Sequence, residues 1–139
     1  MTDMTDERLL EMARDAAENA YAPYSNFRVG AALLCKSGKI YTGCNVENNS
    51  FGLTICAERA AIFKAVSMGE KDFEVMAVST DTGRSVTPCG ACMQVMAEFN
   101  PDIHIVISGE NEGARRICLK KMFPCPFETL KDLKRISSG

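Results

Sequence analysis

The sequence predicts an α/β protein, an α/β/α sandwich built on a five-stranded mixed sheet. Apolar segments of strand length alternate with segments whose apolar residues recur at helical spacing, which is typical of sheets flanked by helices. Turn signals built on Gly, Pro and Asn separate these segments. The chain has 139 residues, of which 46% are apolar and 24% charged. This is enough for one domain, residues 1–139, with its own core.

Five segments have the apolar composition of buried strands. They cover residues 27–35, 39–46, 75–79, 103–107 and 115–119. The Ser37-Gly38 turn makes the first two an antiparallel hairpin. The loop over residues 108–114 cannot hold a crossover helix, so the last two strands should also be antiparallel.

Four segments are predicted to be helical, over residues 5–20, 55–68, 88–99 and 128–136. The first has one apolar face, formed by Leu9, Met12, Ala13, Ala16 and Ala20. Thr5 or Thr2 can cap its N-terminus. In the third, Thr87 is the expected cap and Pro88 the first helical residue.

Charge and cysteine usage restrict the cellular context. The net charge is −2, so no basic field draws the chain to nucleic acid or to an anionic membrane. The sequence has no apolar run of membrane-spanning length, and its acidic start lacks a signal-peptide core. Seven cysteines, an odd number, argue against a disulfide framework. A cytoplasmic protein with reduced thiols is expected.

Three cysteines and a glutamate form the chemical motif of the sequence. Cys56 and Glu58 form C-x-E at the start of one predicted helix, and Cys89 and Cys92 form P-C-x-x-C at the start of another. Catalytic zinc takes three protein ligands and leaves a fourth position to water, beside which a carboxylate can act as general acid and base. The three thiolates can share an ion only if the two helix N-termini meet.

Other interpretations of these cysteines stay open. A C-x-x-C pair alone can be a redox pair. Structural zinc would need a fourth ligand, and the available candidates are Cys35, Cys44, Cys118, Cys125 and His104. None lies at ligand spacing to the three. We expect His104 to be a satisfied core or edge residue and the other four cysteines to act as small hydrophobic residues.

Arg59 lies three residues after Cys56, on the same helix face. Three thiolates and one zinc ion would leave one net negative charge, which weakens the metal as a Lewis acid. A guanidinium that donates N–H groups to thiolate sulfur would offset that charge. The alternative is that Arg59 is a surface residue.

Four motifs together resemble the cytidine deaminases of the small homotetrameric type with a three-cysteine zinc site. They are Y-S-N-F-R-V-G-A-A at 24–32, G-C-N-V-E-N at 43–48, C-A-E-R at 56–59 and P-C-G-A-C at 88–92. The resemblance implies one Zn²⁺ per chain and hydrolytic deamination of cytidine and deoxycytidine to uridine and deoxyuridine plus ammonia, in pyrimidine salvage. It assigns the proton transfers to Glu58, and to Arg59 the charge balance.

The resemblance also implies substrate-binding residues. Asn45 and Glu47 should share one face of a strand end, and the matching family pair binds the sugar. Phe27 matches the phenylalanine that packs on the pyrimidine, although a core role fits it equally, and Ala57 is a further expected contact. Phe51 and Phe127 match aromatics that a neighbouring subunit supplies, which implies a homotetramer with shared sites. The tail around residues 122–127 departs from the family pattern.

Three alternatives to a cytidine deaminase stay open. The first is a deaminase of another aminopyrimidine nucleoside, such as a nucleoside antibiotic. The second is a polynucleotide-editing deaminase, which the acidic charge balance disfavours. The third is a non-catalytic, zinc-stabilised binding module, which the open fourth metal position disfavours.

Overall fold

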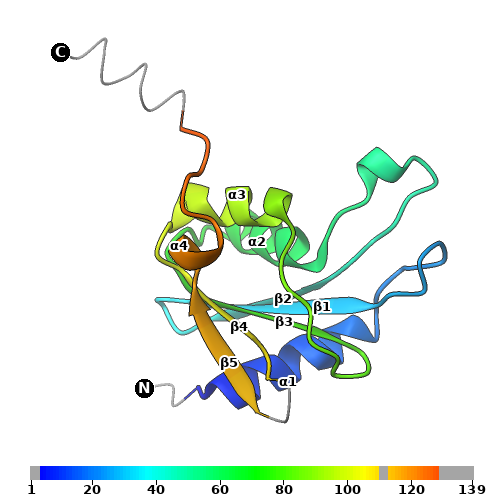
Figure 1. Ribbon diagram of the computed structural model, residues 1–139, viewed down its shortest axis with the longest axis horizontal. Helices are drawn as coiled ribbons and strands as arrows, with labels where there is room; N and C mark the ends of the chain where they lie inside the picture. Colours follow the sequence, from blue (N-terminus) through cyan, green and yellow to red (C-terminus); the bar gives the residue numbers. More distant parts are fainter. Residues whose placement is uncertain (1–3, 110–112, 129–139) are drawn as a thin grey trace.

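A five-stranded mixed sheet forms the centre of the computed structural model, which describes residues 4–109 and 113–128 (Figure 1). The strands are β1 (Val29–Cys35), β2 (Ile40–Cys44), β3 (Phe73–Thr80), β4 (His104–Ser108) and β5 (Ala114–Cys118). Their order in the sheet is β2-β1-β3-β4-β5. The pair β3–β4 is parallel, and the other three pairs are antiparallel. The predicted fold class is therefore confirmed.

Both predicted antiparallel neighbours are present. The register pairs Gly30 with Cys44 in the first hairpin and His104 with Cys118 in the last. Gly38 turns the first hairpin with a φ of 93°, a conformation that glycine adopts without a steric penalty.

Helices cover the two faces of the sheet separately (Figure 1). The helical elements are α1 (Asp6–Ala17), η1 (Phe51–Leu53), α2 (Ala57–Ser67), α3 (Gly90–Phe99) and α4 (Leu119–Met122). Helix α1 lies against one face, and α2 and α3 lie against the other. The predicted helix over 128–136 lies outside the described residues, apart from residue 128. In the part of the chain described here, no helix is long and apolar enough to cross a membrane.

Two apolar clusters, one on each face, explain why the central strands are mostly apolar on both faces. Alternate residues of each strand point to opposite faces. On β1, Leu33 belongs to the cluster under α2 and α3, and Ala32 belongs to the cluster under α1. On β4, Ile105 and Val106 divide in the same way. Both faces of the central strands are therefore buried.

Two glycines allow helices to approach the sheet closely. A Cβ at Gly30 would collide with the backbone of α1. A Cβ at Gly43 would lie 2.5 Å from the backbone nitrogen of Ala61 and 2.7 Å from the carbonyl oxygen of Ala57. Gly43 on β2 therefore sets the position of α2, the helix that begins beside Cys56.

Helix α1 is shorter than predicted and ends at Ala17, not at residue 20. Its buried residues are Leu9, Ala13 and Ala17, so Ala17 belongs to the apolar face and Ala20 does not. The chain leaves the helix because the Tyr21 backbone pairs with the segment after β2, donating to the Asn45 carbonyl at 3.0 Å. A tertiary contact thus overrides the local helical pattern.

The predicted start of α3 is wrong by two residues. The helix begins at Gly90 with Cys89 as its cap, and neither Thr87 nor Pro88 has the predicted role. Cys89 is extended, with φ −78° and ψ 166°, and its carbonyl accepts the first helical hydrogen bond, from Met93 at 3.0 Å. Pro88 is buried, and Thr87 lines a cavity, so packing holds both outside the helix.

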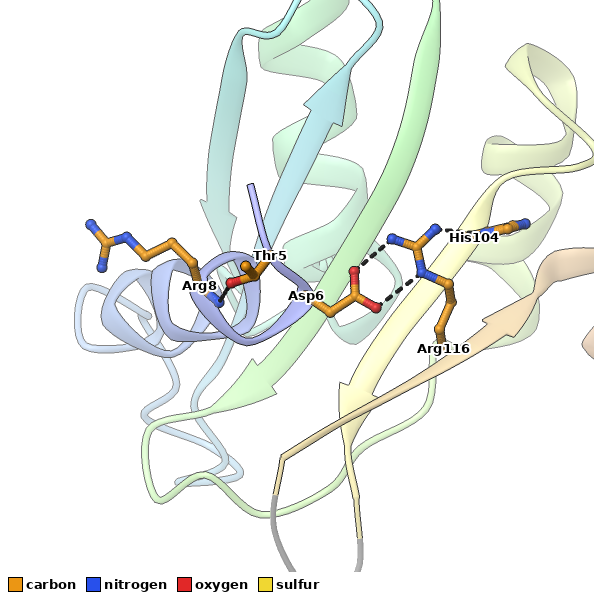
Figure 2. A network of polar contacts seen from close by, with 5 residues as sticks. All are labelled: Thr5, Asp6, Arg8, His104 and Arg116. Atoms are coloured by element: carbon orange, nitrogen blue, oxygen red, sulfur yellow. Dashed lines mark hydrogen bonds and ion pairs between the residues drawn. The ribbon is translucent and has the colours of Figure 1, made fainter. Parts of the chain in front are cut away.

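The N-terminus of α1 is tied to the edge of the sheet (Figure 2). The Thr5 hydroxyl accepts a hydrogen bond from the Arg8 backbone nitrogen at 3.0 Å, which confirms one of the two predicted caps. Arg116 of β5 donates two hydrogen bonds to the Asp6 carboxylate, at 2.6 and 3.0 Å. Its guanidinium also donates to Nδ1 of His104 at 2.8 Å, so His104 is satisfied, as predicted.

Candidate active site

The N-termini of α2 and α3 meet, and each begins at a cysteine. Cys56 caps α2 and Cys89 caps α3, both with extended backbone and without a side-chain capping hydrogen bond. The Sγ atoms of Cys56 and Cys89 are 3.7 Å apart, and those of Cys89 and Cys92 are 3.5 Å apart. The extended cap residues turn the thiols toward one point, so the predicted constellation assembles.

The donor set fits a zinc ion. All three sulfur atoms lie within 4.8 Å of one another. A tetrahedral site with Zn–S bonds of about 2.3 Å would place its sulfurs roughly 3.8 Å apart, close to the observed separations. Within residues 4–109 and 113–128, no fourth His, Cys, Asp or Glu joins this group. Three ligands with an open fourth position fit a catalytic ion better than a structural one.

The surroundings of Cys56 favour its thiolate form. Hydrogen bonding from Cys92, and then from Arg59, lowers the pKa of the Cys56 thiol to about 5. The same hydrogen bond, together with burial, raises the pKa of Cys92. These opposite shifts favour a thiolate at Cys56 and a protonated thiol at Cys92. A metal cation would favour the thiolate form of all three cysteines.

Arg59 faces the sulfur cluster, as predicted, and is not a surface residue. Its Nη2 donates to the Sγ of Cys56 at 3.4 Å. The Nε atom is buried and finds no hydrogen-bond acceptor among the described groups. Hydrogen bonding to Cys56 is the largest cause of a raised Arg59 pKa, so the guanidinium stays charged. A half-buried, partly unpaired cation suits a site that carries excess negative charge.

Glu58 lies on the first turn of α2 and is buried, with only 4% of the residue exposed. Burial, with a smaller contribution from the charge on Cys56, raises its pKa to about 7. Cys56 and Glu58 line the same cavity although they would diverge on a regular helix. The reason is that Cys56 is the extended cap and lies outside the helical geometry.

A cavity of about 210 Å³ opens above this cluster. Seven of the predicted site residues line it: Phe27, Asn45, Glu47, Cys56, Ala57, Glu58 and Cys89. Cys92 and Arg59 do not. Five further lining residues had no separate signal in the sequence: Ser25, Val29, Thr54, Val86 and Thr87. Ser25 and Val29 stand inside the Y-S-N-F-R-V-G-A-A motif and could have been found there; the other three reach the cavity only through the fold.

Asn45 and Glu47 face the cavity, but both also hold the backbone beside it. The Asn45 amide donates to the Phe27 carbonyl and accepts from the Val29 nitrogen, both at 2.9 Å. The Glu47 carboxylate accepts from the backbone nitrogens of Tyr24 and Ser25, at 3.0 and 3.1 Å, and from the Ser25 hydroxyl. The Ser25 hydrogen bond is the main cause of a lowered Glu47 pKa, so this carboxylate is ionised at neutral pH.

The predicted aromatics divide into two groups. Phe27 lines the cavity and is 39% exposed, so it is not a core residue. Phe51 is 74% exposed and lines a neighbouring cavity of about 370 Å³, where it packs edge-on against Tyr24. The two cavities share Ser25, Glu47 and Thr54. The Phe127 ring is 73% exposed and lines neither cavity.

Comparisons with known proteins agree with this geometry. The model for the cytidine and deoxycytidylate deaminase zinc-binding region matches residues 3–109. A cytidine deaminase of Halalkalibacterium halodurans is 48% identical over 131 residues, which cover 94% of this chain and 98% of that protein. One of Sporosarcina psychrophila is 46% identical over 125 residues, covering 89% and 92%. The crystal structure of a cytidine deaminase from Burkholderia pseudomallei matches with a TM-score of 0.82 and 45% identity, covering 89% of this chain and 100% of that one.

The chain belongs to the cytidine and deoxycytidylate deaminase family, a family of zinc-binding enzymes. The predicted resemblance and the predicted zinc cofactor are confirmed by this match together with the three-cysteine cluster. The chain is therefore a zinc-dependent hydrolytic deaminase.

Proposed function

We propose that this enzyme converts cytidine and deoxycytidine to uridine and deoxyuridine, with release of ammonia, as a step of pyrimidine salvage. The observation that carries the proposal is the buried carboxyl of Glu58 beside the three-cysteine cluster, on the wall of a cavity whose other end is polar. When bound by Cys56, Cys89 and Cys92, zinc supplies a water of lowered pKa at its open position.

Glu58 is the proposed catalytic residue, acting as both acid and base. A pKa of about 7 lets the carboxyl take up and release a proton near neutral pH, which is the range in which proton transfer is most effective. Glu58 would first remove the proton of the attacking water and pass it to the pyrimidine ring nitrogen. The water oxygen would bond to the ring carbon that carries the amino group. Glu58 would then take the remaining hydroxyl proton and pass it to the amino group, which leaves as ammonia as the carbon–oxygen double bond forms. Burial keeps bulk water from exchanging with this proton.

The polar end of the cavity suits a sugar. Glu47 is an ionised acceptor that is held in place by three hydrogen bonds, so it can accept from a hydroxyl without reorganising. Phe27 offers an apolar ring for the pyrimidine, and its backbone is fixed on both sides by Ser25 and Asn45. The first-turn N–H of Ala57 has no acceptor within its helix and can meet the ring's polar edge. A 5′-phosphate would approach the Glu47 charge, which disfavours a nucleotide.

A homotetramer with sites shared between subunits is part of the proposal. Phe51 and Phe127 both expose about three quarters of their surface, which is unusual for single phenylalanines and suits burial against another copy. A cytoplasmic location is also part of it, because all seven cysteines are free thiols and three of them must remain reduced to bind metal.

The proposal is tested by kcat/KM for cytidine, deoxycytidine, CMP, cytosine and an aminopyrimidine nucleoside antibiotic in one buffer, with zinc content measured on the same sample. We expect the two nucleosides to be the best substrates. If CMP or cytosine equals cytidine, the sugar-binding role of Asn45 and Glu47 is wrong. If the antibiotic is the best substrate, the enzyme is a deaminase of another aminopyrimidine nucleoside.

A further inference from the structure

Gln94 makes a reciprocal contact with the backbone of the C-terminal segment. Its Nε2 donates to the Phe127 carbonyl at 3.1 Å, and its Oε1 accepts from the Phe127 nitrogen at 2.9 Å. Both polar groups of one peptide residue are thus paired by one side-chain amide. Gln94 lies on α3, two residues after Cys92. The segment is therefore attached to the helix that carries two of the three metal-binding cysteines.

Phe123 packs against the core at the start of the segment after α4, and the Gln94 amide holds the segment near its other end. Residues 123–128 belong to no helix or strand. Pro124 and Pro126 lack a backbone N–H and have a restricted φ, so they stiffen the segment but give it no donor for a ladder of hydrogen bonds. The orange segment extends away from the sheet in Figure 1, past the layer of α2 and α3. The amide of Gln94 fixes the end of a stiff arm.

The ring held by this arm packs little against the described part of its own chain. Phe127 is 73% exposed and lines neither of the two cavities described above. Fixing its backbone therefore buries little of the ring, and conformational entropy opposes the ordering. Such an arrangement is useful if the ring enters a site on another copy, where a pre-positioned aromatic binds with a smaller entropic cost.

We infer that Gln94 is a positioning residue, which fixes the Phe127 ring for the substrate site of a neighbouring subunit. The inference rests on the proposed shared sites. It adds a residue that touches no substrate and acts through Phe127. Because Gln94 and Cys92 lie on the same helix, the position of the arm is also fixed relative to the cysteine cluster of its own chain.

The test compares Gln94→Ala, Phe127→Ala and the double variant, with Glu98→Ala as control. Glu98 is exposed and lies one turn further along α3. An aromatic contact is worth a factor of about 2 to 10, so Phe127→Ala should raise KM by that amount. Gln94→Ala should raise KM by about two- to five-fold, with kcat within about twofold and zinc content unchanged. In the Phe127→Ala background, Gln94→Ala should cause no further rise in KM. Glu98→Ala should leave KM unchanged.

A second measurement does not depend on activity. The chain contains no tryptophan, so Phe127→Trp introduces a single indole, which can be excited separately from the three tyrosines. We expect the anisotropy of that indole to fall when Gln94→Ala is added and to stay constant when Glu98→Ala is added. If Gln94→Ala does not fold, Gln94→Glu replaces it in both experiments. Gln94→Glu keeps the acceptor for the Phe127 nitrogen but loses the donor, and its effects should be intermediate.

The outcomes separate the inference from the proposal on which it rests. If Phe127→Ala raises KM but Gln94→Ala changes neither KM nor the anisotropy, the positioning role alone is overturned. If Gln94→Ala raises KM as much in the Phe127→Ala background as in the parent, its effect does not pass through Phe127, and the role is overturned as well. If Phe127→Ala leaves KM unchanged, the shared site fails at this residue, and the inference fails with it.

Discussion

The N-terminus of α1 and those of α2 and α3 are built from different residues. Helix α1 begins with Thr5, whose hydroxyl satisfies a first-turn N–H, followed by two acidic residues that suit the positive end of the helix. Helices α2 and α3 begin with Cys56 and Cys89, and neither cap makes a side-chain hydrogen bond. The first arrangement stabilises the fold. The second leaves first-turn N–H groups and a positive potential for thiolates and a ligand.

The comparison predicts that substitutions at the two kinds of helix start will affect different measurements. Changes at α2 and α3 should remove metal or turnover with little loss of fold stability. Changes at α1 should reduce stability and leave the chemistry intact.

The largest effect is expected for Cys89→Ser. A hydroxyl is a poor substitute for a thiolate ligand, so two cysteines should not retain the ion at micromolar zinc, and activity should fall with the metal content. Cys125→Ser is the matched control, because Cys125 is exposed and stands outside the cluster. Metal analysis and initial rates on the same preparations check this. Full zinc in Cys89→Ser would show that the cluster is not the metal site.

Glu58→Gln should be next in size. The amide keeps the shape of the side chain but cannot transfer protons, so kcat should fall by about 10²–10⁴-fold while zinc stays at one per chain. Because the carboxyl is buried and its pKa is raised mainly by that burial, a neutral amide should not lower the thermal midpoint. Glu98→Gln, an exposed change on α3, is the control for kcat. Near-normal turnover in Glu58→Gln would mean that another group moves the proton.

These two residues also show how far the sequence alone could reach. The clustering of Cys56, Cys89 and Cys92 and the position of Glu58 in the same cavity were predictable because short motifs set their spacing. The central strands were predictable because both of their faces are buried. The start of α3 was not, because Cys89 has an extended backbone that places its thiol beside Cys56, although Thr87 and Pro88 satisfy the usual local rules. Local helix propensity carries no information about this contact between distant parts of the chain.

The hydrogen-bond contacts of Glu47 could not be predicted from the sequence for a similar reason. Spacing placed Asn45 and Glu47 on one face, and both do line the cavity. Spacing could not show that Glu47 also accepts three hydrogen bonds from residues 24–25, more than 20 positions away in the chain. It could not show either that Gly43 lets α2 approach β2 closely enough to place Glu58. Long-range packing decides both.

Thr5→Ala is expected to lower the free energy of unfolding by about 1 kcal/mol, because it removes the acceptor for the Arg8 N–H. Thr5→Ser keeps the hydroxyl, and because serine caps helices at least as well as threonine, it should leave the free energy of unfolding unchanged. Denaturant unfolding of zinc-loaded protein measures both. The kcat of each variant should match the parent. A loss of turnover at equal stability would contradict the division between the two kinds of helix start.

The smallest effect is expected for Asp6→Asn, and its pH dependence identifies it. Hydrogen bonds from Arg116 lower the pKa of Asp6 below its ordinary value of 3.8, so ionised Asp6 stabilises the folded state (Figure 2). The Asp6 and Arg116 side chains are 26% and 42% exposed, and solvent screening keeps the contribution at about 0.5–1 kcal/mol. Because the folded-state pKa is lowered, this stability is fully present above pH 3.8 and is lost as the pH falls through the folded-state value. Below that value, the parent and Asp6→Asn should unfold alike.

Glu7→Gln is the matched control for this last prediction. Glu7 also lies in the first turn of α1, and its substitution removes a similar charge from the helix terminus without touching the Arg116 contact. At pH 7, Asp6→Asn should lower the free energy of unfolding more than Glu7→Gln does. The loss caused by Asp6→Asn should vanish in acid, and the losses caused by both variants should shrink in high salt. If Asp6→Asn and Glu7→Gln lose the same stability at pH 7, the helix dipole alone explains Asp6. Arg116 would then contribute nothing to the anchoring of α1 on the sheet.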